Sequence, residues 1–305
     1  MKWAEILKKA FEYLKKYKFL WFLGVLAALT EGGVGSGFGN SGSNLAENNQ
    51  DFEKFGSTIA DWMTSHSVEI SIIVAAIFIV SLIILYISYS SRAGLIYSVD
   101  KLESGSEKLT FSDAFHAGQK YFWRFLGLTV LISLMIGAVV FALVILMIGL
   151  VALTIATTYW LLLLVIPLGI LAIVAIVVFA VYLSLILLLS FRVIVVENYG
   201  ITKSITKSRE LIHHNFANVL IAWLIQVAVG VVVGITVVVV ALIIGGVLLS
   251  IGVGIFFGLG TIGAWVYGSV AVLAFIALML LISGISNAFI STFWTVVYRR
   301  LAKSQ

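Results

Sequence analysis

The sequence contains no cysteine and few charged residues. Of its 305 residues, 11% are Asp, Glu, Lys or Arg. The absence of cysteine excludes disulfide bonds, thiolate metal sites and cysteine nucleophiles. The scarcity of charge excludes an ordinary soluble domain, because 62% of the residues are hydrophobic and the mean hydropathy is +1.15. The composition therefore predicts an integral membrane protein.

Two long stretches, residues 125–191 and 211–298, carry no charged side chain. A helix crosses a hydrocarbon core of about 30 Å with about 20 apolar residues, so each stretch holds more than one crossing. Neither stretch shows the alternation of polar and apolar residues that membrane β-strands require. We therefore expect an all-α fold in a single membrane domain over residues 1–305. Six transmembrane helices are predicted, at residues 19–31, 68–90, 125–150, 161–190, 218–244 and 268–297.

Two of these regions depart from an ordinary span in length. Only Phe19 to Thr30 are uncharged in the first, which gives about 18 Å of helix at 1.5 Å per residue. This span must recruit part of the preceding segment or thin the bilayer. The last stretch has a surplus instead, and residues 245–268 within it contain eight glycines. We predict a re-entrant or interfacial outer segment there, because glycines allow irregular backbone where protein covers it.

The basic residues predict the orientation. Six crossings put both termini on one side, and every Lys and Arg except Lys54 then falls on that side. By the positive-inside rule both termini are cytoplasmic. The Gly/Ser-rich residues 31–67 become a flexible extracytoplasmic loop. A cleaved signal peptide is the alternative at the N-terminus, but the organised pattern of residues 2–18 favours a retained helix.

Three segments have the apolar spacing of amphipathic helices: residues 2–18, 110–127 and 202–220. In the second, Thr110 and Asp113 form a capping box in the sequence. We expect each segment to lie in the cytoplasmic interface and to lead into two spans. This arrangement suggests three repeats of a two-span hairpin, at residues 1–100, 101–200 and 201–305.

Basic side chains of these segments are the candidate contacts to lipid. Anionic headgroups attract such residues at the cytoplasmic face. The candidate headgroup contacts are Lys8, Lys9, Lys15, Lys16, Lys120, Arg124, Lys203 and Lys207. A second candidate site is a cytoplasmic polar cluster formed by Arg92, Arg192, Glu197 and Arg209. The net charge of +5 is thus arranged along a membrane face, which favours anionic lipid over nucleic acid as the partner.

Part of the sequence resembles a known group of proteins. The resemblance is carried by VENYGITKSITKSRELIHHNFANVL (196–220), FHAGQKYFWRFLG (115–127) and KFLWFLGVLAALTEGG (18–33). These runs are similar to uncharacterised six-span prokaryotic proteins that resemble the membrane domain of glycerophosphoryl diester phosphodiesterases. The resemblance implies a multi-pass prokaryotic plasma-membrane protein and no particular activity. The soluble phosphodiesterase domain of some relatives is absent, because no polar segment is long enough to form it.

The sequence offers little chemistry. His213 and His214 are adjacent, so on a helix they point about 100° apart and cannot converge on one metal ion. Asp113 and Glu197 are an acid–base pair only if the fold brings them together. The spans hold no ionisable group, which disfavours proton or sodium coupling. No metal or cofactor is therefore expected.

Three functions remain open. The first is a non-enzymatic protein that binds lipid or a partner and organises the membrane; a protein partner or a homo-oligomer is compatible with it. The second is a transporter or channel for an uncharged or amphiphilic solute, which a cavity lined by Gln226 and Asn287 would favour. The third is an interfacial lipid-processing enzyme, which needs Asp113, Glu197 and a histidine within hydrogen-bond reach.

Overall fold

The computed structural model describes residues 1–31, 64–106, 109–156 and 162–303. The predicted flexible loop at 31–67 lies almost entirely outside these residues. The described chain is helical and contains no strand. Its helices are α1 (Trp3–Lys16), α2 (Phe19–Glu31), α4 (Ser67–Glu103), α5 (Phe111–Gln119), α6 (Phe122–Ala156), α7 (Leu162–Val196), α8 (Ile201–His214) and α9 (Phe216–Ala302).

Five helices within the described residues are long and apolar enough to cross a membrane. They are Ser67–Glu103, Phe122–Ala152, Val165–Val196, Phe216–Gly258 and Gly260–Ala302. Each coincides with one of the predicted spans from the second to the sixth. The predicted first span corresponds to α2, which has 13 residues and is shorter than the roughly 20 that a crossing needs. The membrane-protein prediction thus rests on five helices of sufficient length.

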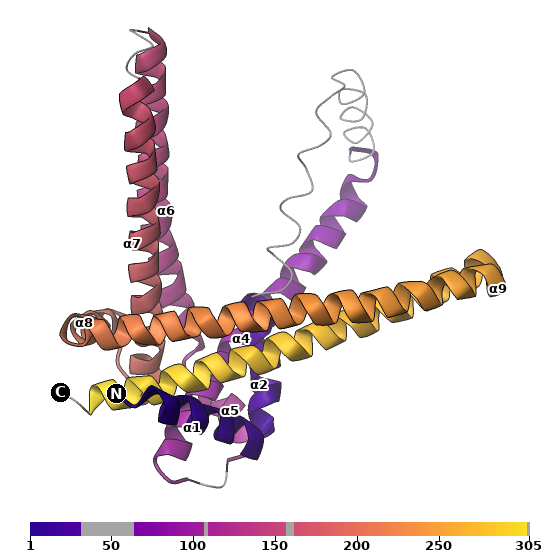
Figure 1. The fold of residues 1–305 in the computed structure, drawn as a ribbon, viewed down its shortest axis with the longest axis horizontal. Helices are drawn as coiled ribbons and strands as arrows, with labels where there is room; N and C mark the ends of the chain where they lie inside the picture. Colours follow the sequence, from indigo (N-terminus) through magenta and orange to yellow (C-terminus); the bar gives the residue numbers. More distant parts are fainter. Residues whose placement is uncertain (32–63, 107–108, 157–161, 304–305) are drawn as a thin grey trace.

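The glycine-rich segment 245–268 differs from the expectation. We expected irregular backbone, but α9 remains helical on both sides of one break at Gly260, where φ is +69°. Only glycine adopts this left-handed conformation readily. The chain reverses there, so the two halves of α9 form a long hairpin (Figure 1). The surplus residues lengthen two helices because the other glycines of the segment are tolerated in helical backbone.

Helix ends and short helices pack into one compact part of the molecule, which we call the base. In the base, α1, α2, α5 and α8 contact the end of α4, the start of α6, the end of α7 and both ends of α9. Its largest fully buried side chains include Trp294, Tyr298, Phe125 and Phe191. Both chain termini lie at the base (Figure 1). The apolar parts of the long helices project from it.

Outside the base the long helices expose apolar side chains. Ile72 of α4, Phe141 of α6, Val178 of α7 and Leu242 of α9 are each more than half exposed. The pair α6–α7 and the two halves of α9 leave the base in different directions (Figure 1). Exposed apolar surface on this scale is suited to contact with lipid chains rather than water.

The three segments predicted to be amphipathic contain α1, α5 and α8, and each of these helices buries one face in protein. The second predicted segment runs on into α6 and the third into α9. Helix α1 buries Ile6, Ala10 and Leu14 and packs against α9. Helix α5 buries Ala114 and Gly118 against α4, where a side chain on Gly118 would meet the backbone of Ser90 and Gly94. The stripes that the sequence showed are therefore in contact with the base.

The predicted capping box of α5 is confirmed. The backbone N–H of Asp113 donates to Thr110 Oγ1, and the backbone N–H of Thr110 donates to the Asp113 carboxylate. The hydroxyl of Thr110 also donates to this carboxylate, at 2.6 Å. These hydrogen bonds lower the pKa of Asp113, because they favour its charged form. Helix α5 therefore begins at a fixed position.

A polar cavity as the candidate functional site

A cavity of about 430 Å³ lies between α2, α4, α7 and α9. Seven of the ten residues that line it are polar, which sets it apart from the apolar hollows elsewhere in the described chain. Helix α2 contributes Ala28, α4 contributes Arg92, and α7 contributes Leu188 and Arg192. The remaining wall comes from both halves of α9 and consists of Gln226, Ser283, Ser286, Asn287, Ile290 and Ser291.

Two arginines face this one cavity from different helices. Arg192 is 3% exposed, and its Nη1 donates to the carbonyl oxygen of Leu188 one helical turn earlier. Arg92 stacks over the ring of Phe191, with Cζ 4.6 Å from the ring centroid. An arginine stays protonated in a protein, so both side chains bring positive charge to the cavity. Stacking and a backbone acceptor hold the two guanidinium groups in place.

The amide of Gln226 is oriented by a tryptophan. The indole N–H of Trp294 donates to Gln226 Oε1 at 2.5 Å, and Trp294 is fully buried. An indole nitrogen can only donate, so the amide oxygen faces Trp294. The amide NH2 group of Gln226 is then the part that can donate to a molecule in the cavity.

The second half of α9 contributes one continuous polar face. Ser283, Asn287 and Ser291 are four residues apart and therefore lie on one side of the helix, and Ser286, three residues after Ser283, adjoins them. Ser286 Oγ donates to the carbonyl oxygen of Ile282. Ser291 Oγ is buried and has no hydrogen-bond partner among the described residues. Because Ser291 lines the cavity, its hydroxyl is available to donate to a molecule bound there.

The cavity is therefore rich in donors. Guanidinium, amide and hydroxyl groups converge on it, and the described residues that line it include no Asp or Glu. Such a set of donors fits the oxygens of a phosphate or carboxylate group. The rest of the wall is apolar and consists of Ala28, Leu188 and Ile290.

The predicted polar cluster is divided in the structure. Arg92 and Arg192 line the cavity, whereas Glu197 accepts a hydrogen bond from the hydroxyl of Tyr298 and pairs with Lys207 at 3.8 Å. Arg209 lies exposed on α8. The fold separates these residues because Glu197 follows the end of α7, beyond the turn of helix that carries Arg192.

The eight predicted headgroup contacts also fall into two groups. Three have partners within the protein: Lys9 with Glu103 at 2.7 Å, Lys207 with Glu197, and Arg124 with the side-chain oxygen of Asn198 at 2.7 Å. The other five have exposed side chains, namely Lys8, Lys15, Lys16, Lys120 and Lys203. The second group is the more exposed, and two of its members make local contacts: Lys8 pairs with Glu12 at 4.0 Å, and Lys16 lies over the ring of Tyr17.

The residues named for acid–base chemistry have separate partners. Asp113 caps α5, and Glu197 contacts Tyr298 and Lys207. His116 Nδ1 lies 2.9 Å from the carbonyl oxygen of Ser112. In the described part of the chain, no three His, Asp or Glu side chains gather as a metal site would require. The arrangement therefore contains no assembled acid–base or metal centre among these residues.

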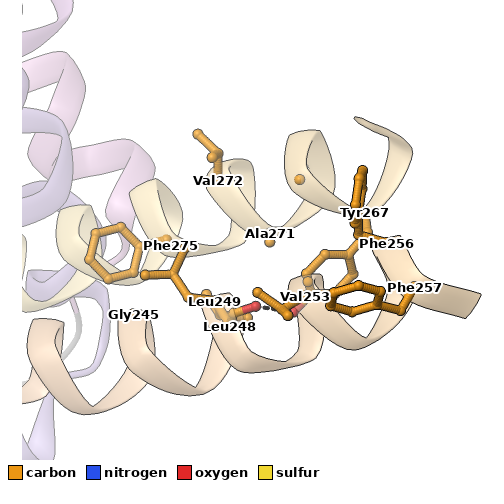
Figure 2. A pocket seen from close by; sticks show the side chains of 12 residues that line it. Gly245, Leu248, Leu249, Val253, Phe256, Phe257, Tyr267, Ala271, Val272 and Phe275 are labelled. Carbon is orange, nitrogen blue, oxygen red and sulfur yellow. Dashed lines mark hydrogen bonds between the residues drawn. The ribbon is translucent and has the colours of Figure 1, made fainter. Parts of the chain in front are cut away.

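A second hollow, of about 570 Å³, lies within the hairpin of α9 (Figure 2). It is lined by apolar side chains such as Phe256 and Phe275 and by glycines, including Gly245 and Gly252. The hydroxyl of Tyr267 crosses it to the carbonyl oxygen of Leu248 at 3.0 Å. It offers no charged group, so it is a poor site for a polar ligand.

Sequence reasoning found the polar residues of the cavity but not their convergence. Along the sequence, Ser283, Ser286 and Asn287 are a patch of small and polar residues, a pattern that more often indicates helix packing. This part of α9 both lines the cavity and packs against a helix, since neighbouring Gly284 contacts Val25 of α2. The available signal was the shared helical spacing of these residues, which predicts one face but no partner helix.

Comparison with known proteins gives a family without a function. Residues 16–302 match the model of DUF7544, a family of unknown function, and the chain belongs to that family. No curated protein and no solved structure matches it. The expected link to the membrane domain of glycerophosphoryl diester phosphodiesterases finds no support in these comparisons.

Proposed function

We propose that this member of DUF7544 is a non-enzymatic membrane protein that binds the anionic headgroup of a lipid in its polar cavity. The observation that carries the proposal is the presence of Arg92 and Arg192 in one cavity with Gln226 and Asn287. Charge-assisted hydrogen bonds from guanidinium groups are shorter and stronger than neutral ones, and they match the geometry of phosphate oxygens.

The proposed setting is a prokaryotic plasma membrane with both termini in the cytoplasm. The distribution of Lys and Arg supports this orientation, and so does the position of both termini at the base. In this arrangement α2 also crosses the membrane, which makes six crossings in all. It is short, and its contacts with α4 and α9 stabilise it. Helices α1, α5 and α8 lie in the cytoplasmic interface, and the chain repeats a two-span hairpin three times.

The test is a binding measurement on the purified full chain in a neutral detergent. The probes are dioctanoyl phosphatidylglycerol, dioctanoyl phosphatidylcholine and inorganic phosphate, titrated by calorimetry. We expect phosphatidylglycerol to bind more tightly than phosphatidylcholine. Tight binding of inorganic phosphate alone would instead assign the cavity to a free anion. Equal affinity for all three probes, or no binding, would contradict the proposal.

Two substitutions in the cavity, Arg92→Gln and Ser291→Ala, test whether the lipid binds there. Arg92→Gln removes a charged donor, so the affinity for phosphatidylglycerol should fall by about tenfold or more. Arg209→Gln is the matched control, because it removes the same charge from an exposed position outside the cavity. Ser291→Ala should weaken binding severalfold without destabilising the ligand-free protein, because its hydroxyl has no partner to lose. Equal effects of Arg92→Gln and Arg209→Gln would refute a defined site.

Transport of an amphiphilic solute is the second candidate function. The observation that favours it is the position of Gln226 and Asn287 in the wall of one cavity. Reconstituted vesicles that contain fluorescent phosphatidylglycerol distinguish the two functions. Movement of this lipid between leaflets that is accelerated by the protein and lost in Arg92→Gln would indicate transport, whereas binding without movement supports the first function.

A further inference from the structure

A separate groove of about 620 Å³ lies between the junction of α1 and α2 and the hairpin of α9. Its wall is apolar on both sides. Phe11 and Leu14 of α1 and Trp21 of α2 face Val229, Val233, Ile285 and Phe289 of α9. We call it the lateral groove. Its volume is within the range of sites that hold small amphiphilic molecules.

Two lysines line the lateral groove, mainly with their apolar stems, so that their charge lies at its rim. Lys15, in the last turn of α1, and Lys18, in the turn that follows, both line it and both have exposed side chains. Lys18 was not among the residues predicted from the sequence to contact headgroups. Helix α1 also holds Trp21 in place, because the indole N–H of Trp21 donates to the carbonyl oxygen of Leu14 at 2.9 Å. The groove thus combines a fixed aromatic ring, two cations and an apolar wall.

We infer that the lateral groove binds one anionic phospholipid, with its phosphate between Lys15 and Lys18 and an acyl chain along α9. Charge complementarity selects the headgroup, and the apolar side chains of α9 match the chain. The α1–α2 junction lies where the charged N-terminal helix gives way to apolar sequence, which is the level at which a bilayer changes from headgroups to hydrocarbon. A phospholipid is the abundant molecule with both parts at that level.

This site is distinct from the polar cavity, although Ser286 lines both hollows. None of the arginines of the cavity lines the groove, and neither lysine lines the cavity. The two sites therefore respond to different substitutions. A lipid in the groove should remain bound when Arg92 is changed, whereas a ligand of the cavity should not.

The experiment is native mass spectrometry of the full chain with added dioleoyl phosphatidylglycerol or dioleoyl phosphatidylcholine. In Lys15→Gln/Lys18→Gln the affinity for phosphatidylglycerol should fall by about thirtyfold, which corresponds to about 2 kcal/mol for the two lysines together, because each attracts the anionic headgroup. Val233→Trp fills the groove without changing charge, so it should reduce binding of both lipids. Arg92→Gln should leave the lipid of the groove in place.

The control is Lys8→Gln/Lys120→Gln, which removes two exposed lysines that do not line the groove. If both double variants lose phosphatidylglycerol equally, the attraction is diffuse and the groove is not a site. Unchanged binding in Val233→Trp would also overturn the inference. Circular dichroism and thermal melts of each variant show that the lost affinity does not come from unfolding.

Discussion

Replacing Gly284 with alanine should separate α2 from α9 and disturb the wall of the polar cavity. An added Cβ at this position would lie 2.5 Å from Val25 Cα and 2.7 Å from Val25 N. Ordinary contacts of a Cβ atom begin at 3.4 Å, so the two helices must move apart by about 1 Å. The nearest opposing atom, Val25 Cγ2, belongs to a side chain that can rotate, but Cα and N belong to the backbone of α2 and cannot.

The expected cost is that of overpacking a close helix contact, about 1–3 kcal/mol. Alanine also has the better helix propensity, by about 1 kcal/mol, which offsets part of this cost. Gly230→Ala is the matched control, because Gly230 lies in the same helix with no atom within 4 Å of the added Cβ. The difference between the two variants isolates the packing cost.

The assay is equilibrium unfolding in mixed micelles with increasing SDS, followed by circular dichroism. Gly284→Ala should unfold at a lower SDS fraction than Gly230→Ala. Binding of phosphatidylglycerol should also weaken, because Ser283 and Asn287 move with Gly284. Equal stability of the two variants would refute the close approach of α2 and α9 on which the shape of the cavity depends.

Three further predictions concern the base and the topology. Glu103→Gln removes the negative charge that Lys9 and the hydroxyl of Tyr13 contact at 2.7 and 3.0 Å, although an acceptor oxygen remains, and should cost about 1 kcal/mol. Faster hydrogen exchange in α1 checks this prediction, and unchanged exchange would contradict it. Thr110→Ala should destabilise α5 by about 1 kcal/mol at pH 7. Because the folded-state pKa of Asp113 is lowered, its contribution exists above the unfolded pKa and disappears as the pH falls through the folded pKa, so melting curves of the variant and the parent should converge in acid. In this cysteine-free chain, single cysteines at Lys303 and at Phe257, near the tip of the α9 hairpin, should be labelled from opposite sides of the membrane; labelling of residue 303 from outside would reverse the orientation.

The long apolar helices could be predicted from sequence because local composition decides them. An uncharged stretch such as residues 211–298 allows its backbone to satisfy its hydrogen bonds only within helices. The break at Gly260 could not be located, since eight glycines in residues 245–268 offered the same freedom. Which of them takes a positive φ depends on how the two halves of α9 pair.

For the candidate site, too, the sequence predicted some of the residues but not which of them lie together. Arg92 and Arg192 were named from the sequence, but their expected companions Glu197 and Arg209 are not in the cavity. A charge pattern indicates which residues lie at one level of the membrane and does not indicate which helices are neighbours. Gln226 and Asn287 were recognised as rare polar residues of the spans, and only the packing of α9 against α2, α4 and α7 brings them to the arginines.

The sequence by itself determined that the chain is helical and apolar, where its long helices lie, and where α5 begins. These properties depend on interactions between residues that are near one another along the chain. The tertiary structure decided that α1, α5 and α8 bury their apolar faces in protein, that one glycine reverses α9, and that two arginines share a cavity with an amide face of α9. These features depend on contacts between segments far apart in the sequence, such as Gly284 with Val25, and no local pattern specifies them.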